Sequence, residues 1–140
     1  MTTPATLALR SAIFERLKAD STLMDLLGEG GVYDHPPRNA RFPNVSLESA
    51  GSRPLLEGEE AGLLHDLKLV VHSRQPSSDE THILAARITD LLMQPGFSLQ
   101  DHHLVGLQIT SVTTRLLRDG RSFKGELSLR AVTEPAMTAA

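Results

Sequence analysis

The sequence predicts an α+β protein of two layers, in which two main helices cover one face of a mostly antiparallel sheet of about four strands. Three observations lead to this prediction. Residues 4–19 carry apolar side chains at helical spacing, and residues 63–74 alternate between apolar and polar side chains. Residues 105–131 form two further alternating arms on either side of Asp119–Gly120, a dipeptide typical of hairpin turns.

The first helix is expected over residues 4–19, because its apolar side chains recur at every fourth position and form one stripe. A short second turn follows from Ser21, taken as its cap, to Leu27, and Gly28 is expected to end it in a left-handed conformation. The stripe of the first helix consists of Leu9, Ile13 and Leu17.

The other main helix is expected to begin at Ser77 and to end before Pro95–Gly96. Ser77 and Glu80 have the spacing of a capping box, in which each side chain bonds a backbone amide of the first turn. Its apolar stripe carries no polar interruption and consists of Leu84, Ile88, Leu91 and Leu92.

The strands are expected from alternation of period two. A first strand starts at Val45 and Leu47, and the strand at 63–74 faces inward through Leu67, Leu69 and Val71. In the last hairpin, Asp119–Gly120 predicts a type I′ turn, and a drift of the inward phase predicts a bulge near Thr110–Thr113. The second sheet face is expected to be polar with stray apolar residues, which are Val70, Val112 and Val132.

The chain is expected to form one domain over residues 1–140, with an exposed acidic loop at 50–62 and a flexible tail at 135–140. No apolar run approaches the roughly 20 residues that a bilayer span requires, so no membrane association is expected. Charged residues interrupt the N-terminal segment, which does not have the pattern of a secretory signal.

Composition narrows the classes of function. The chain has 17 acidic residues against 14 lysines and arginines, which argues against wrapping nucleic acid through phosphate contacts. It has no cysteine, which excludes disulfides and thiolate nucleophiles. The six histidines show no zinc-binding spacing, and no nucleophile elbow or phosphate-binding loop occurs. We therefore assign no catalytic, cofactor-binding or metal-ligating residue and expect a protein that is not an enzyme.

Three motifs follow one another along the chain: Val32-Tyr33-Asp34-His35-x-Pro37, then Phe42-Pro43-x-Val45-x-Leu47, then Arg118-Asp119-Gly120-Arg121-x-Phe123-x-Gly125 running on to Arg130-Ala131-Val132-Thr133-Glu134. In this order, with a helix before them and a helix between them, they resemble a family of tail-completion proteins, the tail terminators of long-tailed phages and gene transfer agents. The resemblance extends over roughly Leu7 to Glu134.

The resemblance implies a structural subunit of a homo-oligomeric ring, usually a hexamer. Such a ring caps the tail tube, contacts the tail tube protein and the head-side connector or stopper, and lets DNA pass through its lumen without sequence-specific binding. It is expected to assemble in the bacterial cytoplasm and to remain at the head–tail junction of the particle.

The resemblance implies structural roles for the motif residues. Tyr33 and Pro37 fix the approach of the chain to the sheet, Phe42–Pro43 starts a strand, and Asp119–Gly120 turns the hairpin. A separate expectation concerns the acidic loop, whose charge suits a lumen through which DNA slides without sticking. The residues of this lumen or docking loop are Arg53, Glu57, Glu59 and Glu60.

Two alternatives remain open at this point. One is a head-side adaptor or stopper, which is also a small ring protein. The other is a small-ligand-binding α+β domain with a pocket between the helices and the sheet, for which the uninterrupted apolar stripe of the 77–92 helix gives no support.

Overall fold

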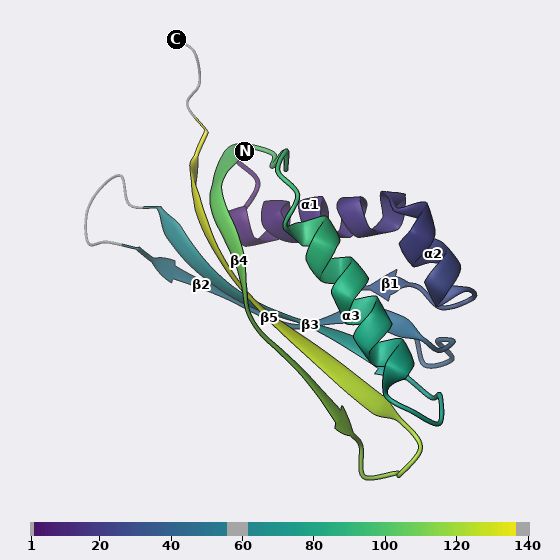
Figure 1. Ribbon diagram of the computed structural model, residues 1–140. Coiled ribbons are helices and arrows are strands. Elements are labelled where there is room, and N and C mark those ends of the chain that lie inside the picture. Colours follow the sequence, from purple (N-terminus) through teal and green to yellow (C-terminus); the bar gives the residue numbers. More distant parts are fainter. Residues whose placement is uncertain (1, 56–61, 137–140) are drawn as a thin grey trace.

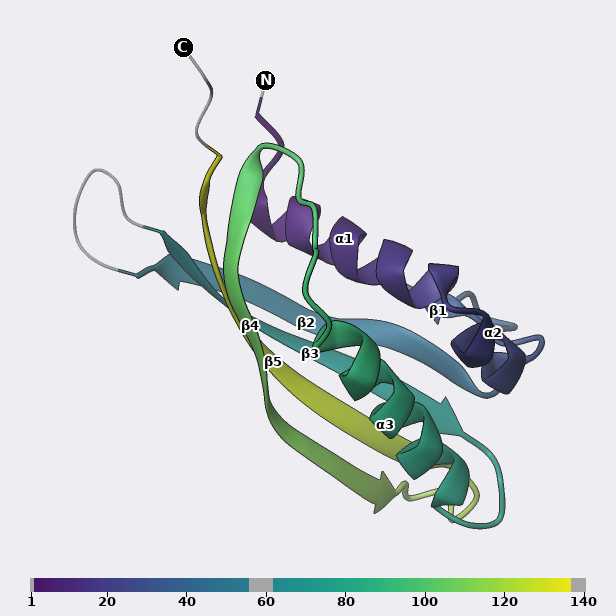
Figure 2. The same ribbon diagram turned by 45° about the horizontal axis from the view of Figure 1, so that its top comes forward.

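The computed structural model describes residues 2–55 and 62–136. Along the chain, the elements are α1 (Ala5–Ala19), α2 (Ser21–Leu27), β1 (Val32–Tyr33), β2 (Asn44–Pro54), β3 (Leu63–Ser73), α3 (Asp79–Leu92), β4 (His102–Leu116) and β5 (Phe123–Pro135). The helices lie together against one face of a twisted open sheet (Figure 1), with α1 and α3 crossing it side by side (Figure 2). The predicted α+β class and its two layers are confirmed.

The sheet contains five strands in the order β1-β2-β3-β5-β4, where about four were expected. Neighbouring strands are antiparallel except β1 and β2, which pair in parallel through Val32–Val45 and Tyr33–Ser46. The additional strand is only two residues long, and alternation cannot reveal a strand that short.

The core lies between the helices and the inward face of the sheet. The predicted apolar stripes of the helices are buried. On the sheet side they pack in one cluster with Leu67, Leu69 and Val71 of β3. Helix α3 packs closely on the sheet at Gly125 of β5, where an added Cβ would lie 2.5 Å from Thr81 Cγ2. None of the helices in the described residues is both long and apolar enough to cross a membrane.

Helix capping differs from the prediction at two places. The cap of α2 is Asp20 rather than Ser21, because the Asp20 carboxylate accepts a 2.8 Å hydrogen bond from the Leu23 amide. The predicted capping box at Ser77 and Glu80 is wrong: Ser77 Oγ accepts a 3.3 Å hydrogen bond from the Asp79 amide instead of the Glu80 amide, and the Glu80 carboxylate accepts a hydrogen bond from Ser73 Oγ. At α2 a carboxylate takes the place of the expected serine hydroxyl, and at α3 the Glu80 side chain bonds a residue of the preceding strand rather than the first turn of its own helix.

Asp20 also joins two helices, since its carboxylate accepts hydrogen bonds from Nε and Nη2 of Arg87 on α3. This ion pair lowers the pKa of Asp20. We expect Asp20→Ala to remove both the cap and the ion pair, and the cap alone is worth about 1 kcal/mol. Asp20→Asn keeps an oxygen that can cap the helix, so the urea midpoint of unfolding should fall less than half as far in this variant as in Asp20→Ala. Equal midpoints in the two variants would contradict this assignment of the cap.

Two boundaries of the strands are corrected. β2 continues through Pro54 and β5 through Pro135, so residues 50–54 of the expected loop and residue 135 of the expected tail belong to strands. Both strands are held in the sheet by regular pairing, with Pro54 opposite Leu63 and Pro135 opposite His102.

The β4–β5 hairpin is present, but its predicted type I′ turn is wrong. That turn requires a positive φ at both central residues, whereas of Asp119 and Gly120 only Gly120 has one, at 69°. The loop spans six residues and closes through Leu117 and Ser122. The predicted bulge is confirmed by a register shift between Ile109 and Ser111.

Candidate assembly surfaces

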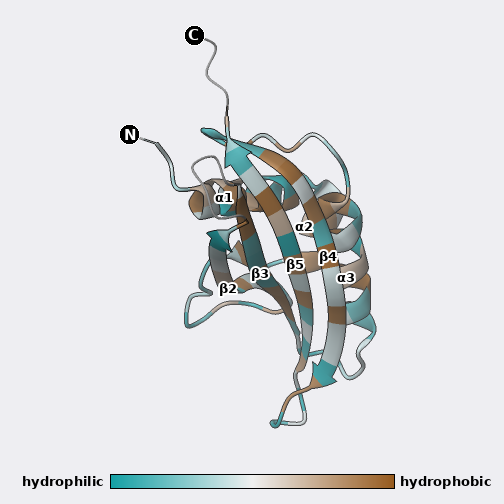
Figure 3. Cartoon of the chain, turned by 90° about the vertical axis from the view of Figure 1, so that its left-hand side faces the viewer, coloured by the Kyte–Doolittle hydropathy of each residue, from teal (hydrophilic) through white to brown (hydrophobic). Residues whose placement is uncertain are grey.

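The side chains of the sheet that point away from the helices form a second face, here called the polar face. Figure 3 looks onto the sheet with the helices behind it. The face is dense in charge: arginines and lysines from β2, β3, β4 and β5 stand among carboxylates of the same strands. Five cations of the polar face form ion pairs with carboxylates: Arg53, Lys68, Arg115, Lys124 and Arg130.

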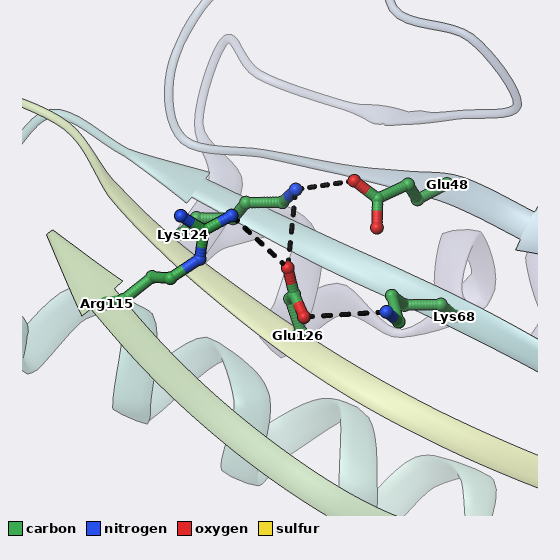
Figure 4. A network of polar contacts seen from close by, with 5 residues as sticks. All are labelled: Glu48, Lys68, Arg115, Lys124 and Glu126. Carbon is green, nitrogen blue, oxygen red and sulfur yellow. Dashed lines mark hydrogen bonds and ion pairs between the residues drawn. The ribbon is translucent and has the colours of Figure 1, made fainter. Parts of the chain in front are cut away.

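Glu126 of β5 is the centre of one group (Figure 4). Its carboxylate lies 3.4 Å from Lys124 Nζ, 3.6 Å from Lys68 Nζ and 3.6 Å from Arg115 Nη2. Lys124 also donates to Glu48 of β2. Partial burial raises the pKa of Glu126, but the hydrogen bond from Lys124 and the surrounding cations outweigh it, and the pKa is lowered overall.

Asp66 of β3 is the centre of the second group. It accepts a 2.7 Å hydrogen bond from Arg53 Nη1 and a 3.2 Å hydrogen bond from Arg130 Nε. The bond from Arg53 is the main cause of the lowered pKa of Asp66. The two groups connect four strands with ion pairs, and the cations that they hold are engaged within the protein.

The polar face also covers apolar surface. Val70 is 2% exposed although it lies opposite the helices, between Ser46 and Glu126 in the register. The long side chains around it therefore shield it from water. Val70 therefore lies on the polar face, as expected. Val112, however, was expected there and pairs with Leu127, which places it on the helix side.

Two strand edges have no partner among the residues that the structure describes. β1 pairs with β2 only at Val45 and Ser46, so the edge of β2 from Leu47 to Pro54 is free. On the opposite side of the sheet, β4 is the last strand, and its 15 residues have a neighbour only in β5. Unpaired edges are templates for pairing with another chain.

The predicted motif residues between β1 and β2 gather at one corner. The ring of Tyr33 lies over Gly31, Pro37 is exposed and accepts a turn hydrogen bond from Ala40, and Arg74 stacks 4.1 Å above the ring of Phe42. Pro43, which follows a cis peptide bond, is buried, and β2 begins directly after it.

The remaining predicted residues divide between two places. Asp119 accepts hydrogen bonds from the amides of Arg121 and Ser122 and organises the β4–β5 loop, at the opposite end of the sheet from the paired residues Pro54 and Leu63. Arg53 lies on the polar face, paired with Asp66. Glu57, Glu59 and Glu60 lie outside the described residues, so their placement as a lumen or docking loop stays a prediction.

The two histidines of β3 lie on opposite faces of the sheet. His65 faces the helices and is fully buried, whereas His72 lies on the polar face beside Lys124. Within the described ranges, no three His, Cys, Asp or Glu side chains come together as metal ligands would.

The sequence model of a family described as "Tail completion protein gp17" matches residues 11–134. The chain belongs to this family. It is similar to a chain from the virion of a native gene transfer agent (GTA) particle, with 25% identity, a TM-score of 0.84, and coverage of 95% of this chain and 99% of that chain. The predicted resemblance is therefore confirmed.

The tail completion fold also resembles the structure of the bacteriophage SPP1 gp17 protein, with a TM-score of 0.58 over 97% of this chain and 94% of that chain. At 18% identity, this second likeness concerns the fold alone. No curated protein sequence matches. The chain is a tail completion protein of a phage or GTA particle, a structural component of the virion.

Two histidines of β3, one buried and one half-buried, give this tail completion protein an expected pH dependence. Burial lowers the pKa of His65 and of His72, so the fold favours their neutral forms. Their contribution to stability is complete above the unfolded pKa of about 6.5 and is lost as the pH falls below it. Asp20, Asp66, Asp119 and Glu126 have lowered pKa values, so their contribution is lost only below about pH 4.

Urea midpoints should therefore begin to decline below about pH 6.5. In His65→Gln, the decline between pH 7 and 5 should be shallower, because one of the two imidazoles whose pKa burial lowers is gone. An identical slope in this variant and in the unaltered chain would contradict the assignment to His65.

Proposed function

We propose that this tail completion protein is the subunit of a closed ring, expected to be a hexamer, that terminates the tail tube and joins it to the head-side connector. The observation that carries the proposal is the pair of unpaired edges on opposite sides of one sheet. Edges of this kind suit head-to-tail contacts, which generate rings when the rotation closes. The likeness to a chain of a GTA virion supports a place in such a particle.

DNA passes through the lumen of the proposed ring, and the polar face of the sheet lines it. DNA binds proteins mainly through free lysines and arginines, which displace counterions from its phosphates. On the polar face, the cations instead bind carboxylates of the same face. The loop with Glu57, Glu59 and Glu60 is proposed to add negative charge at one rim. Such a lining lets the polyanion slide without being held.

The proposed partners are the tail tube protein on one side of the ring and the connector or stopper on the other. The two ends of the sheet carry different residues, so each end can bind a different partner. The paired residues Pro54 and Leu63 lie at one end, and the β4–β5 loop with Asp119 and the corner with Phe42 lie at the other. The ring forms in the bacterial cytoplasm and remains at the head–tail junction.

Deletion of the gene, with complementation in trans, tests the proposal. Particles made without the chain should contain filled heads and unattached tails in electron micrographs, and supplying the unaltered gene should restore joined particles. Heads and tails that join normally without the chain would contradict the proposed function.

A further inference from the structure

We propose that neighbouring subunits join through their strand edges: the outer edge of β4 in one copy pairs, antiparallel, with the free Leu47–Pro54 edge of β2 in the next. This inference rests on the proposed ring and names the contact that closes it. The occupant of each edge is a second copy of this chain.

Strand direction fits this contact. β3 and β4 run opposite to β2 and β5, because the pairs β2–β3, β3–β5 and β5–β4 are all antiparallel. A rotation about an axis roughly along the strands leaves every strand direction unchanged. β4 of one copy therefore meets β2 of the next in antiparallel orientation, and the polar faces of the two sheets stay on the same side. Antiparallel pairing is the more stable arrangement.

The two edges also cover the same stretch of the sheet along the strand direction. The register aligns Leu47 with Leu69, Leu127 and Val112 across the four strands. At the other end, it aligns Pro54 with Leu63, Thr133 and Leu104. The free part of β2 is therefore level with Leu104–Val112 of β4, while β1 occupies the edge of β2 beyond it.

Exposed apolar side chains stand at both ends of this level stretch. Val105 is 55% exposed and lies level with the end of β2, where Leu55 is 44% exposed. Val112 is 44% exposed and lies level with the partly buried Leu47. Pairing of the edges brings these side chains together and removes them from water.

The sequence of β4 lacks the usual protection of an edge strand. It is 15 residues long and contains neither proline nor lysine. Natural proteins rarely leave so long an edge without such residues. Its two register shifts, at Leu104/Gly106 and Ile109/Ser111, bend the strand, as strands of closed sheets often bend. An edge with these properties is suited to a partner.

Disulfide trapping tests the contact, because the chain has no cysteine of its own. Ser49 and Ser111 are exposed on the polar face and level with each other. In one subunit they are three strand spacings apart, about 14 Å, which a disulfide cannot bridge. A bond between Ser49→Cys and Ser111→Cys therefore requires two copies.

Because closing a sheet staggers its register, Ser49→Cys is also combined with Gln108→Cys and with Thr113→Cys. Each variant, as the sole copy of the chain, is oxidised in assembled particles and analysed on denaturing gels without reductant. At least one pair should shift most of the chain from the monomer band to a ladder ending at the closed ring. Single-cysteine variants and the pair Ser111→Cys with Glu15→Cys, which lies on α1, should give no ladder.

The outcomes separate the inference from the proposed function. If the chain is present in a ring at the junction and all three double-cysteine variants stay monomeric, edge pairing is wrong but the proposed ring is still supported. If Ser111→Cys alone gives dimers, β4 pairs with itself, and the inference is likewise wrong. If the chain is absent from the particles, the proposed function fails.

Discussion

Gly30→Ala is expected to destabilise the protein by about 3 kcal/mol or more, because a side chain at this position meets backbone. A Cβ on Gly30 would lie 1.6 Å from the carbonyl oxygen of Pro43 and 2.8 Å from its carbonyl carbon. Neither atom can rotate away. To make room, the chain around Pro43 must move, which disturbs the 2.9 Å hydrogen bond from the Val45 amide to the Gly31 carbonyl.

The matched control is Gly51→Ala. Gly51 lies in β2, and a Cβ added to it would have nothing within 4 Å, so the methyl group meets open space. Because glycine weakens a strand interior, this variant should be as stable as the unaltered chain or slightly more stable. Urea unfolding followed by circular dichroism measures both. A Gly30→Ala midpoint equal to that of Gly51→Ala would contradict the close packing of this corner.

The double variant Asp66→Asn with Glu126→Gln is expected to bind double-stranded DNA at least about tenfold more tightly at low salt than the unaltered chain. The substitutions remove the carboxylates at the centres of both ion-paired groups. Arg53, Arg130, Lys68 and Arg115 then lose their carboxylate partners and become available to phosphates, whereas Lys124 keeps its ion pair with Glu48. The gain should decline steeply as salt is added.

Glu15→Gln with Asp25→Asn is the matched control, because it changes the net charge equally but on the exposed side of the helix layer. It should leave DNA binding near that of the unaltered chain. Fluorescence anisotropy with a labelled duplex compares the three proteins, and far-ultraviolet circular dichroism establishes that each is folded. Equal binding by the two double variants would show that net charge, and not the polar face, controls contact with DNA.

The main elements of the fold could be predicted from the sequence, because they depend on periodicity. Leu9, Ile13 and Leu17 mark one helix whatever surrounds them, and Leu67, Leu69 and Val71 mark a strand in the same way. The errors lie where a distant residue decides the local structure. Glu80 bonds Ser73 of β3 rather than capping α3, and Asp20, which caps α2, also binds Arg87 of α3.

The assembly surfaces were less accessible to sequence reasoning. Alternation predicts that Lys124, Glu126 and Arg130 point outward, but which charges meet depends on register, and bulges on β2 and β4 shift that register. Which strands lie at the edges depends on the order of the sheet, and β1 was too short to be recognised as a strand. The signal available was the absence of proline and lysine from residues 102–116, which has meaning only once those residues are known to form an edge.

The central claim, a ring subunit at the end of the tail tube, is tested most directly by electron cryomicroscopy of intact particles. We expect a closed ring of this fold at the head–tail junction, with the polar face of each sheet toward the axis and the helices outside. Density that places the chain elsewhere in the particle, or outside any ring, would contradict it.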